Sequence, residues 1–128
     1  MANILVVDDD KDVINILEMA LPDYGFETKG VSRSQDIFDN LHKFMPNVIL
    51  LDVNLEDEDG RIICNDLKTQ YLTKNIPVIL ISGNDKVKED VDYFMADDFL
   101  LKPLNMDKLV DRLRWYSDPS YSKLTPIK

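Results

Sequence analysis

The sequence predicts an α/β protein with a doubly wound, parallel, five-stranded sheet, and two observations support this prediction. First, short runs of apolar residues alternate with segments in which apolar residues recur every three or four positions. Second, this strand-then-helix pattern occurs five times, which favours a parallel sheet covered by helices on both faces. With 128 residues, 45% of them hydrophobic, the chain is long enough to bury the core of one domain.

Strands are predicted where short apolar runs are bounded by polar residues. Four such runs are 4–7, 48–51, 78–81 and 99–101, and their composition is typical of buried strands. A further strand is predicted at 26–31, where the residues are more polar. That polarity favours an edge position for this second strand of the chain.

Helices are predicted between and after the strands from the spacing of apolar residues. The predicted segments are 13–21, 34–44, 61–69, 87–94 and 106–113. Pro22 and Gly25 should end the first helix, and Asn105 is the expected N-cap of the last.

The remaining segments set the expected domain boundaries. Residues 1–116 are predicted to form the single domain. Residues 117–128 include Pro119 and Pro126 and are expected to be a loose C-terminal tail or the start of a linker. Residues 54–59 are expected to form an acidic loop after the third strand.

Reactive side chains stand at the carboxyl ends of four predicted strands. They are Asp8, Asp9 and Asp10 after the first strand, Asp52 at the third, Ser82 at the fourth and Lys102 after the fifth. If the strand order is 2-1-3-4-5, the topological switch point of the sheet lies between the first and third strands, and ligands bind at this point in such folds. The sequence therefore predicts one site at this edge of the sheet, with Asp10 serving as a helix N-cap instead.

Composition excludes some classes of function. The net charge of −9 argues against direct nucleic-acid binding, which needs a basic surface. Cys64 is the only cysteine, so an internal disulfide is impossible. The sequence contains no apolar stretch long enough for a transmembrane span, and a cytoplasmic protein without membrane contact is expected.

The acidic residues predict a site for a cation and a phosphoryl group. Carboxylates held close together raise one another's pKa unless a positive charge neutralises them. Mg²⁺ prefers one or two carboxylates together with water and phosphate oxygens. Lys102 and the Ser82 hydroxyl could contact phosphoryl oxygens. Because Asp52 stands alone at the end of a central strand, it is the candidate for accepting a phosphoryl group as an aspartyl phosphate.

These residues, in this order, resemble the receiver domain of two-component response regulators, including the chemotaxis regulators. The resemblance covers roughly residues 3–116 and rests on Asp8-Asp9, Asp52, Ser82 and Lys102-Pro103, supported by Asp59-Gly60 and Ala96-Asp97-Asp98. It implies the flavodoxin-like (βα)5 fold. Leu55-Glu56 and Met95 depart from the methionine-proline pair and the glycine that the family often has at these positions.

The resemblance implies a role for each residue of the site. Asp52 would be the phosphorylation site, and Mg²⁺ (or Mn²⁺) would be held by Asp8, Asp9, Asp52 and the backbone carbonyl of Asn54, with Asp8 acting mainly through water. Lys102 and Ser82 would contact the phosphoryl group. Ser82 and Phe99 would be the switch residues, and the Lys102-Pro103 peptide bond would be cis.

The function that the resemblance implies is a signalling switch of a phosphorelay, not an enzyme. A sensor histidine kinase or a histidine phosphotransfer protein would donate the phosphoryl group. The face formed by the fourth helix, fifth strand and last helix of the predicted pattern (87–94, 99–101 and 106–113) would then change shape. That face would bind an output partner of unknown identity, or form a homodimer.

Two alternatives stay open at this point. A pseudo-receiver would be a protein-binding module without phosphorylation, but it would lack a residue of the pocket, and none is missing. A small Mg²⁺-dependent phosphatase of the haloacid-dehalogenase type would need Asp-x-Asp-x-Thr/Val after the first strand, and Asp12 breaks that pattern. Both a stand-alone receiver and a piece of a larger regulator or hybrid kinase fit this sequence.

Overall fold

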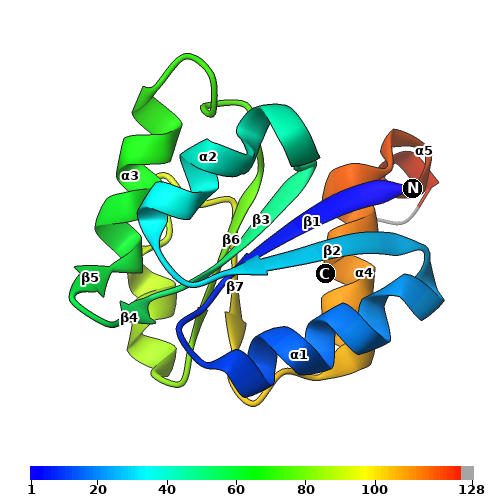
Figure 1. The fold of residues 1–128 in the computed structure, drawn as a ribbon, viewed down its shortest axis with the longest axis horizontal. Coiled ribbons are helices and arrows are strands. Elements are labelled where there is room, and N and C mark those ends of the chain that lie inside the picture. The colour runs from blue at the N-terminus through cyan, green and yellow to red at the C-terminus, as the bar shows by residue number, and fades with distance from the viewer. Residues whose placement is uncertain (125–128) are drawn as a thin grey trace.

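A computed structural model of the protein describes residues 1–124 (Figure 1). The elements are β1 (Ala2–Val7), α1 (Lys11–Ala20), the 3-10 helix η1 (Leu21–Tyr24), β2 (Phe26–Val31), α2 (Ser34–Phe44), β3 (Val48–Asp52), β4 (Asn54–Leu55), β5 (Glu58–Asp59), α3 (Gly60–Thr69), β6 (Val78–Ser82), the 3-10 helix η2 (Asp85–Asp90), β7 (Asp98–Leu101), α4 (Met106–Ser117) and α5 (Pro119–Leu124). The last four residues of the predicted tail, including Pro126, lie outside the described part of the chain.

Five strands form one parallel sheet in the order β2-β1-β3-β6-β7. Because β6 and β7 are the fourth and fifth strands of the predicted pattern, this order confirms 2-1-3-4-5. The polar strand β2 lies at an edge, as its composition predicted. Every residue of the central strands β3 and β6 is buried.

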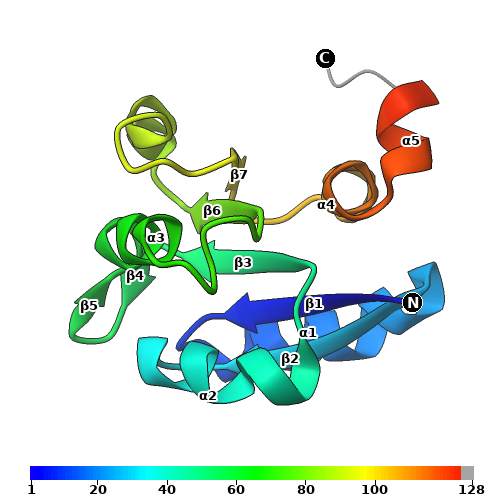
Figure 2. The ribbon, with the colours of Figure 1, turned by 90° about the horizontal axis from the view of Figure 1, so that it is seen from above.

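Helices cover both faces of the sheet, with α2 and α3 on one side and α1 and α4 on the other (Figures 1 and 2). Successive residues of a strand point to opposite faces, so β1 contributes to both cores. Leu5 and Val7 pack in the core beneath α2 and α3, and Ile4 and Val6 pack in the core beneath α1 and α4. Two apolar layers therefore hold the strand ends in place.

The segment between β6 and β7 differs from the prediction. An α-helix was expected at 87–94, but the chain forms the 3-10 helix η2 followed by turns. A 3-10 helix rises about 2.0 Å per residue and an α-helix about 1.5 Å, so the 3-10 form spans the same distance with fewer residues. The turns end at Met95, whose φ of 64° places a non-glycine residue in the left-handed region, at a cost of about 1–2 kcal/mol.

Two further segments are more ordered than predicted. Residues 54–59 contain the antiparallel hairpin β4–β5, with Asp57 at a φ of 63° in its turn. Residues 119–124 form helix α5, although 117–128 were expected to be a loose tail. Asp118 accepts a hydrogen bond from the Ser120 N–H at 3.0 Å, and Pro119 suits the first helical position, which explains where α5 begins.

Across residues 1–124, the structure contains no helix whose length and apolar character would let it span a bilayer.

Gly60 allows the start of α3 to lie directly against the end of β3. A Cβ at this position would be 2.2 Å from the backbone oxygen of Asp52 and 2.8 Å from the Cα of Val53. Both are backbone atoms, which cannot move away without displacing the strand. The glycine therefore permits the close approach that places the β4–β5 hairpin beside Asp52.

We predict that Gly60→Ala lowers the free energy of unfolding by about 1–3 kcal/mol, because the added methyl group overlaps the backbone of β3. Urea denaturation followed by circular dichroism measures this change. Gly83→Ala is the matched control, because nothing lies within 4 Å of a Cβ at that position. Equal losses in the two variants would contradict the close-approach argument.

Candidate functional site

The carboxyl ends of three strands, β1, β3 and β7, bring four charged side chains together. Asp8 and Asp9 directly follow β1, Asp52 is the last residue of β3, and Lys102 directly follows β7. Ligand oxygens of Asp8, Asp9 and Asp52 lie within 4.8 Å of one another. Asp8 is fully buried and Asp52 is 4% exposed, whereas Asp9 is exposed. The predicted acidic cluster therefore exists, with one member facing solvent.

Lys102 joins the two buried carboxylates. Its Nζ donates to Asp8 Oδ2 at 3.0 Å and to Asp52 Oδ2 at 3.1 Å. The second oxygen of each carboxylate accepts from the backbone: Asp8 Oδ1 from the Asp10 N–H at 2.9 Å, and Asp52 Oδ1 from the Asn54 N–H at 3.1 Å. These bonds fix the orientation of both carboxylates, and the residues that they join lie far apart in the sequence.

Burial and repulsion shift the protonation of this cluster. Desolvation and the neighbouring charge of Asp8 raise the pKa of Asp52 from 3.8 to about 6, although the Asn54 N–H and Lys102 act in the opposite direction. Desolvation acts to lower the pKa of Lys102, but its bond with Asp8 and the charge of Asp52 outweigh that and raise it. The single ammonium group therefore only partly neutralises the acids.

The donor set fits a hard divalent cation. Three carboxylates face one ammonium group, so negative charge remains in excess, and the exposed Asp9 is open to solvent. Oxygen ligands from a few carboxylates, completed by water, are what Mg²⁺ prefers. Asn54 follows Asp52 by two residues at the start of β4, and it lines one open pocket together with Asp9. A bound cation would supply the missing positive charge.

Ser82 and Phe99 are held by contacts outside the acidic cluster. Ser82 is fully buried at the end of β6, and its Oγ accepts from the Asn84 N–H at 3.0 Å. Phe99 is partly buried against the core beneath α2 and α3, and it also lines a groove bounded by η2, β7 and α4. The Lys102-Pro103 bond is cis, as the resemblance implied.

Asp10 is separate from the acidic cluster. It caps α1, with its Oδ1 accepting from the Asp12 N–H at 3.0 Å, as predicted. Helix α4, the last helix of the predicted pattern, likewise has the predicted N-cap Asn105, whose side chain accepts from the Lys108 N–H.

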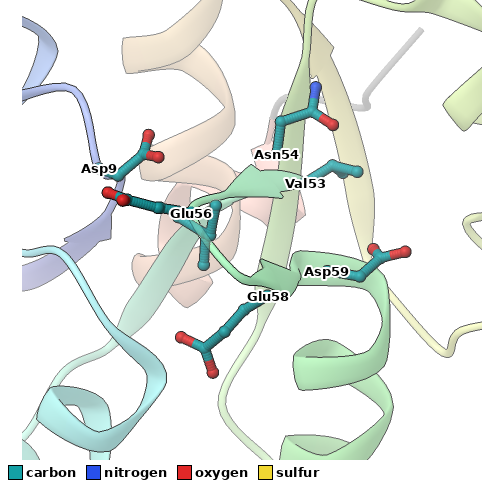
Figure 3. A pocket seen from close by; sticks show the side chains of 7 residues that line it. Asp9, Val53, Asn54, Glu56, Glu58 and Asp59 are labelled. Carbon is teal, nitrogen blue, oxygen red and sulfur yellow. The ribbon is translucent and has the colours of Figure 1, made fainter.

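Beside the cluster lies an open pocket formed by Asp9 and the β4–β5 hairpin (Figure 3). In Figure 3, Glu56 points toward the side of Asp9, whereas Glu58 points away from it, toward the segment that leads into α2. Glu58 in fact accepts hydrogen bonds from Ser34. The sequence predicts only an acidic loop for these residues. It does not indicate a role for Ser34, whose partner Glu58 is distant in the sequence, or for Arg61, whose contact with Asp59 depends on the hairpin.

Arg61 holds the opposite side of the hairpin. Its guanidinium contacts Asp59 at 2.8 Å and Asp90 of η2 at 2.8 Å, and it lies over the ring of Phe94 at 5.6 Å. The bond with Arg61 lowers the pKa of Asp59. The hairpin is therefore attached both to the start of α2 and to η2.

We predict that, in metal-free protein, the Asp52 carboxyl titrates with a midpoint of about 6. Asp8→Asn should lower this midpoint because it removes a repelling charge, whereas Asp10→Asn should leave it near the wild-type value. The carboxyl group of Asp52 binds its proton more tightly in the folded protein than in the unfolded chain. Its contribution to the free energy of unfolding should therefore decrease as the pH rises from 3.8 to about 6. Carboxyl ¹³C NMR measures the midpoint, and a wild-type value at or below 3.8 would contradict the prediction.

Comparison with known proteins agrees with this geometry. The model of the response regulator receiver domain family matches residues 4–114. A putative response regulator from Chloroflexus aurantiacus J-10-fl is similar, with 28% identity, a TM-score of 0.82 and coverage of 90% of this chain and 96% of that one. NtrX from Brucella abortus is 28% identical with a TM-score of 0.81, over 96% of this chain and 29% of that one.

A third solved structure shows the same fold at lower identity. The response regulator TrrA from Thermotoga maritima, in complex with Mg²⁺-BeF, is 21% identical with a TM-score of 0.80, covering 91% of this chain and 99% of that one. Because the family model spans most of the 128 residues and the acidic cluster lies at the expected sheet edge, the chain belongs to the response regulator receiver domain family.

Proposed function

We propose that this chain is a phosphorylation-dependent switch whose acceptor is Asp52. The observation that carries the proposal is the position of this carboxylate. It ends a fully buried central strand, bonds to Lys102 and lies within ligand distance of Asp8 and Asp9. Receiver domains act with sensor kinases and output domains, and this chain retains the charged groups that phosphoryl transfer requires.

The transfer requires positioning and charge neutralisation more than covalent assistance. A carboxylate oxygen of Asp52 would attack the phosphorus of a phosphohistidine, forming the P–O bond as the P–N bond breaks, and the released imidazole nitrogen would keep the electron pair. Mg²⁺, held by Asp8, Asp9, Asp52 and the Asn54 carbonyl, would neutralise phosphoryl charge. Lys102 would move its contact from Asp52 to a phosphoryl oxygen, and its second contact with Asp8 would keep it in reach.

The signal would pass from Asp52 to the face formed by η2, β7 and α4. Negative charge on Asp52 would attract the Ser82 hydroxyl at the neighbouring strand end, and Phe99 would move into the space that this shift opens. The groove beside Phe99, lined also by Lys88 and Arg112, would change shape. We propose that an output partner, or a second copy of the chain in a homodimer, reads this change through that face. We also propose that the chain acts in the cytoplasm without enzymatic turnover of its own.

We predict that Asp52→Asn abolishes Mg²⁺-dependent labelling by acetyl phosphate, since the amide cannot accept the phosphoryl group. Intact-protein mass spectrometry measures the added mass. Asp10→Asn is the control, because it also removes one negative charge but lies outside the acidic cluster. This variant should be labelled like the wild type. Labelling that persists in Asp52→Asn would show that another residue is the acceptor.

Beryllofluoride distinguishes the switch from a protein-binding module that is never phosphorylated. We predict that beryllofluoride with Mg²⁺ shifts the amide resonances of Ser82, Phe99 and η2, and that omitting Mg²⁺ removes the effect. A pseudo-receiver would give no Mg²⁺-dependent shift. Steady turnover of a phosphate ester would instead favour the phosphatase alternative.

A further inference from the structure

The β4–β5 hairpin carries one of the proposed metal ligands on a very short scaffold. Asn54 pairs with Asp59, and Leu55 pairs with Glu58, so each strand has only two residues. An isolated two-stranded hairpin is marginally stable even when longer. The position of the Asn54 carbonyl must therefore depend on contacts that the hairpin makes with the rest of the protein.

Four contacts hold the hairpin in place. Leu55 is buried in the core, and the Gly60 N–H donates to the Val53 carbonyl at 2.8 Å, which closes the base of the hairpin. Asp59 bonds to Arg61 on the side of η2. On the opposite side, Glu58 is the residue that reaches α2.

Glu58 and Ser34 form a two-point contact. One carboxylate oxygen of Glu58 accepts from the Ser34 N–H at 3.1 Å, and the other accepts from the Ser34 hydroxyl. Ser34 is the first residue of α2, whose N-cap, Arg33, makes no capping bond with its side chain. Glu58 thus replaces the missing cap from a distant part of the chain, and its negative charge is favourable at the positive end of the helix.

We propose that Ser34 and Glu58 are positioning residues of the metal site: their contact fixes the β4–β5 hairpin and thereby the Asn54 carbonyl. This inference rests on the proposed function. Ser34 does not line the pocket, carries no charge and lies outside the acidic cluster. Its influence on a cation must therefore be transmitted through the position of the hairpin. By reciprocity, cation binding strengthens the contact and steadies the start of α2.

The test compares Mg²⁺ affinity among variants by isothermal titration calorimetry. Ser34→Ala removes the hydroxyl donor without changing charge, and we expect it to weaken Mg²⁺ binding by about three- to tenfold, the range that one hydrogen bond gives. Ser32→Ala is the control, because Ser32 is exposed and close in sequence. Affinity of Ser34→Ala equal to that of Ser32→Ala, with only thermal stability reduced, would overturn the proposal.

A second pair of variants separates position from charge. Glu58→Gln and Glu56→Gln each remove one negative charge from the hairpin, but only Glu58 contacts Ser34. We expect Glu58→Gln to weaken Mg²⁺ binding more than Glu56→Gln does, and less so when Ser34 is already alanine. An effect of Glu56→Gln that equals or exceeds that of Glu58→Gln would indicate simple electrostatics, because Glu56 points toward the side of Asp9, and would overturn the proposal.

The amide resonances of the wild type give a third readout and separate the two levels of inference. Addition of Mg²⁺ should shift the Ser34 amide together with that of Asn54, and an unmoved Ser34 amide counts against the inference. If the wild type binds Mg²⁺ and is labelled at Asp52 but Ser34→Ala behaves like Ser32→Ala, only this inference fails. If the wild type binds no Mg²⁺ and takes no label, the proposed function fails with it.

Discussion

The site depends on the repulsion between two buried carboxylates, Asp8 and Asp52. Lys102 bonds to both and neutralises their charge only in part. Each would be costly to bury alone, because a charge in an apolar environment loses its hydration. The ammonium group bonds to both, yet it leaves negative charge in excess, as the raised pKa of Asp52 indicates. An arrangement of this kind favours the binding of a cation, which would supply the positive charge that Lys102 alone does not.

The fold supplies this arrangement because parallel strands end at the same edge. Asp8 and Asp52 come from strands β1 and β3, which are neighbours in the sheet although 44 residues separate the two acids. Lys102 comes from beyond β7, two strands away from β3. Its long side chain crosses that distance, so the lysine is also a physical link between the acidic cluster and the face that contains Phe99.

Much of this could be predicted from the sequence, because the relevant signals are local or topological. Apolar runs identified the buried strands, their alternation with helical spacing indicated a parallel sheet, and strand-end acids indicated the cluster, whereas the strand order was assumed as that of the receiver fold. The cap residues Asp10 and Asn105 were predictable because capping depends on a few adjacent residues. The 3-10 form of η2 was not predictable, since Val87, Val91 and Phe94 have the spacing of an α-helix.

The contacts of the β4–β5 hairpin could not be predicted from the sequence, and the reason is physical. Four consecutive acids, 56–59, are expected to repel one another and remain solvated. In the structure, two of them have specific partners: Glu58 caps α2 and Asp59 pairs with Arg61. Those partners come from opposite sides, so the acids are separated, and Gly60 lets the chain turn tightly beneath them. A run that the sequence predicts to be an acidic loop is thus held between α2 and α3, because Glu58 bonds to Ser34 of α2 and Asp59 bonds to Arg61 of α3.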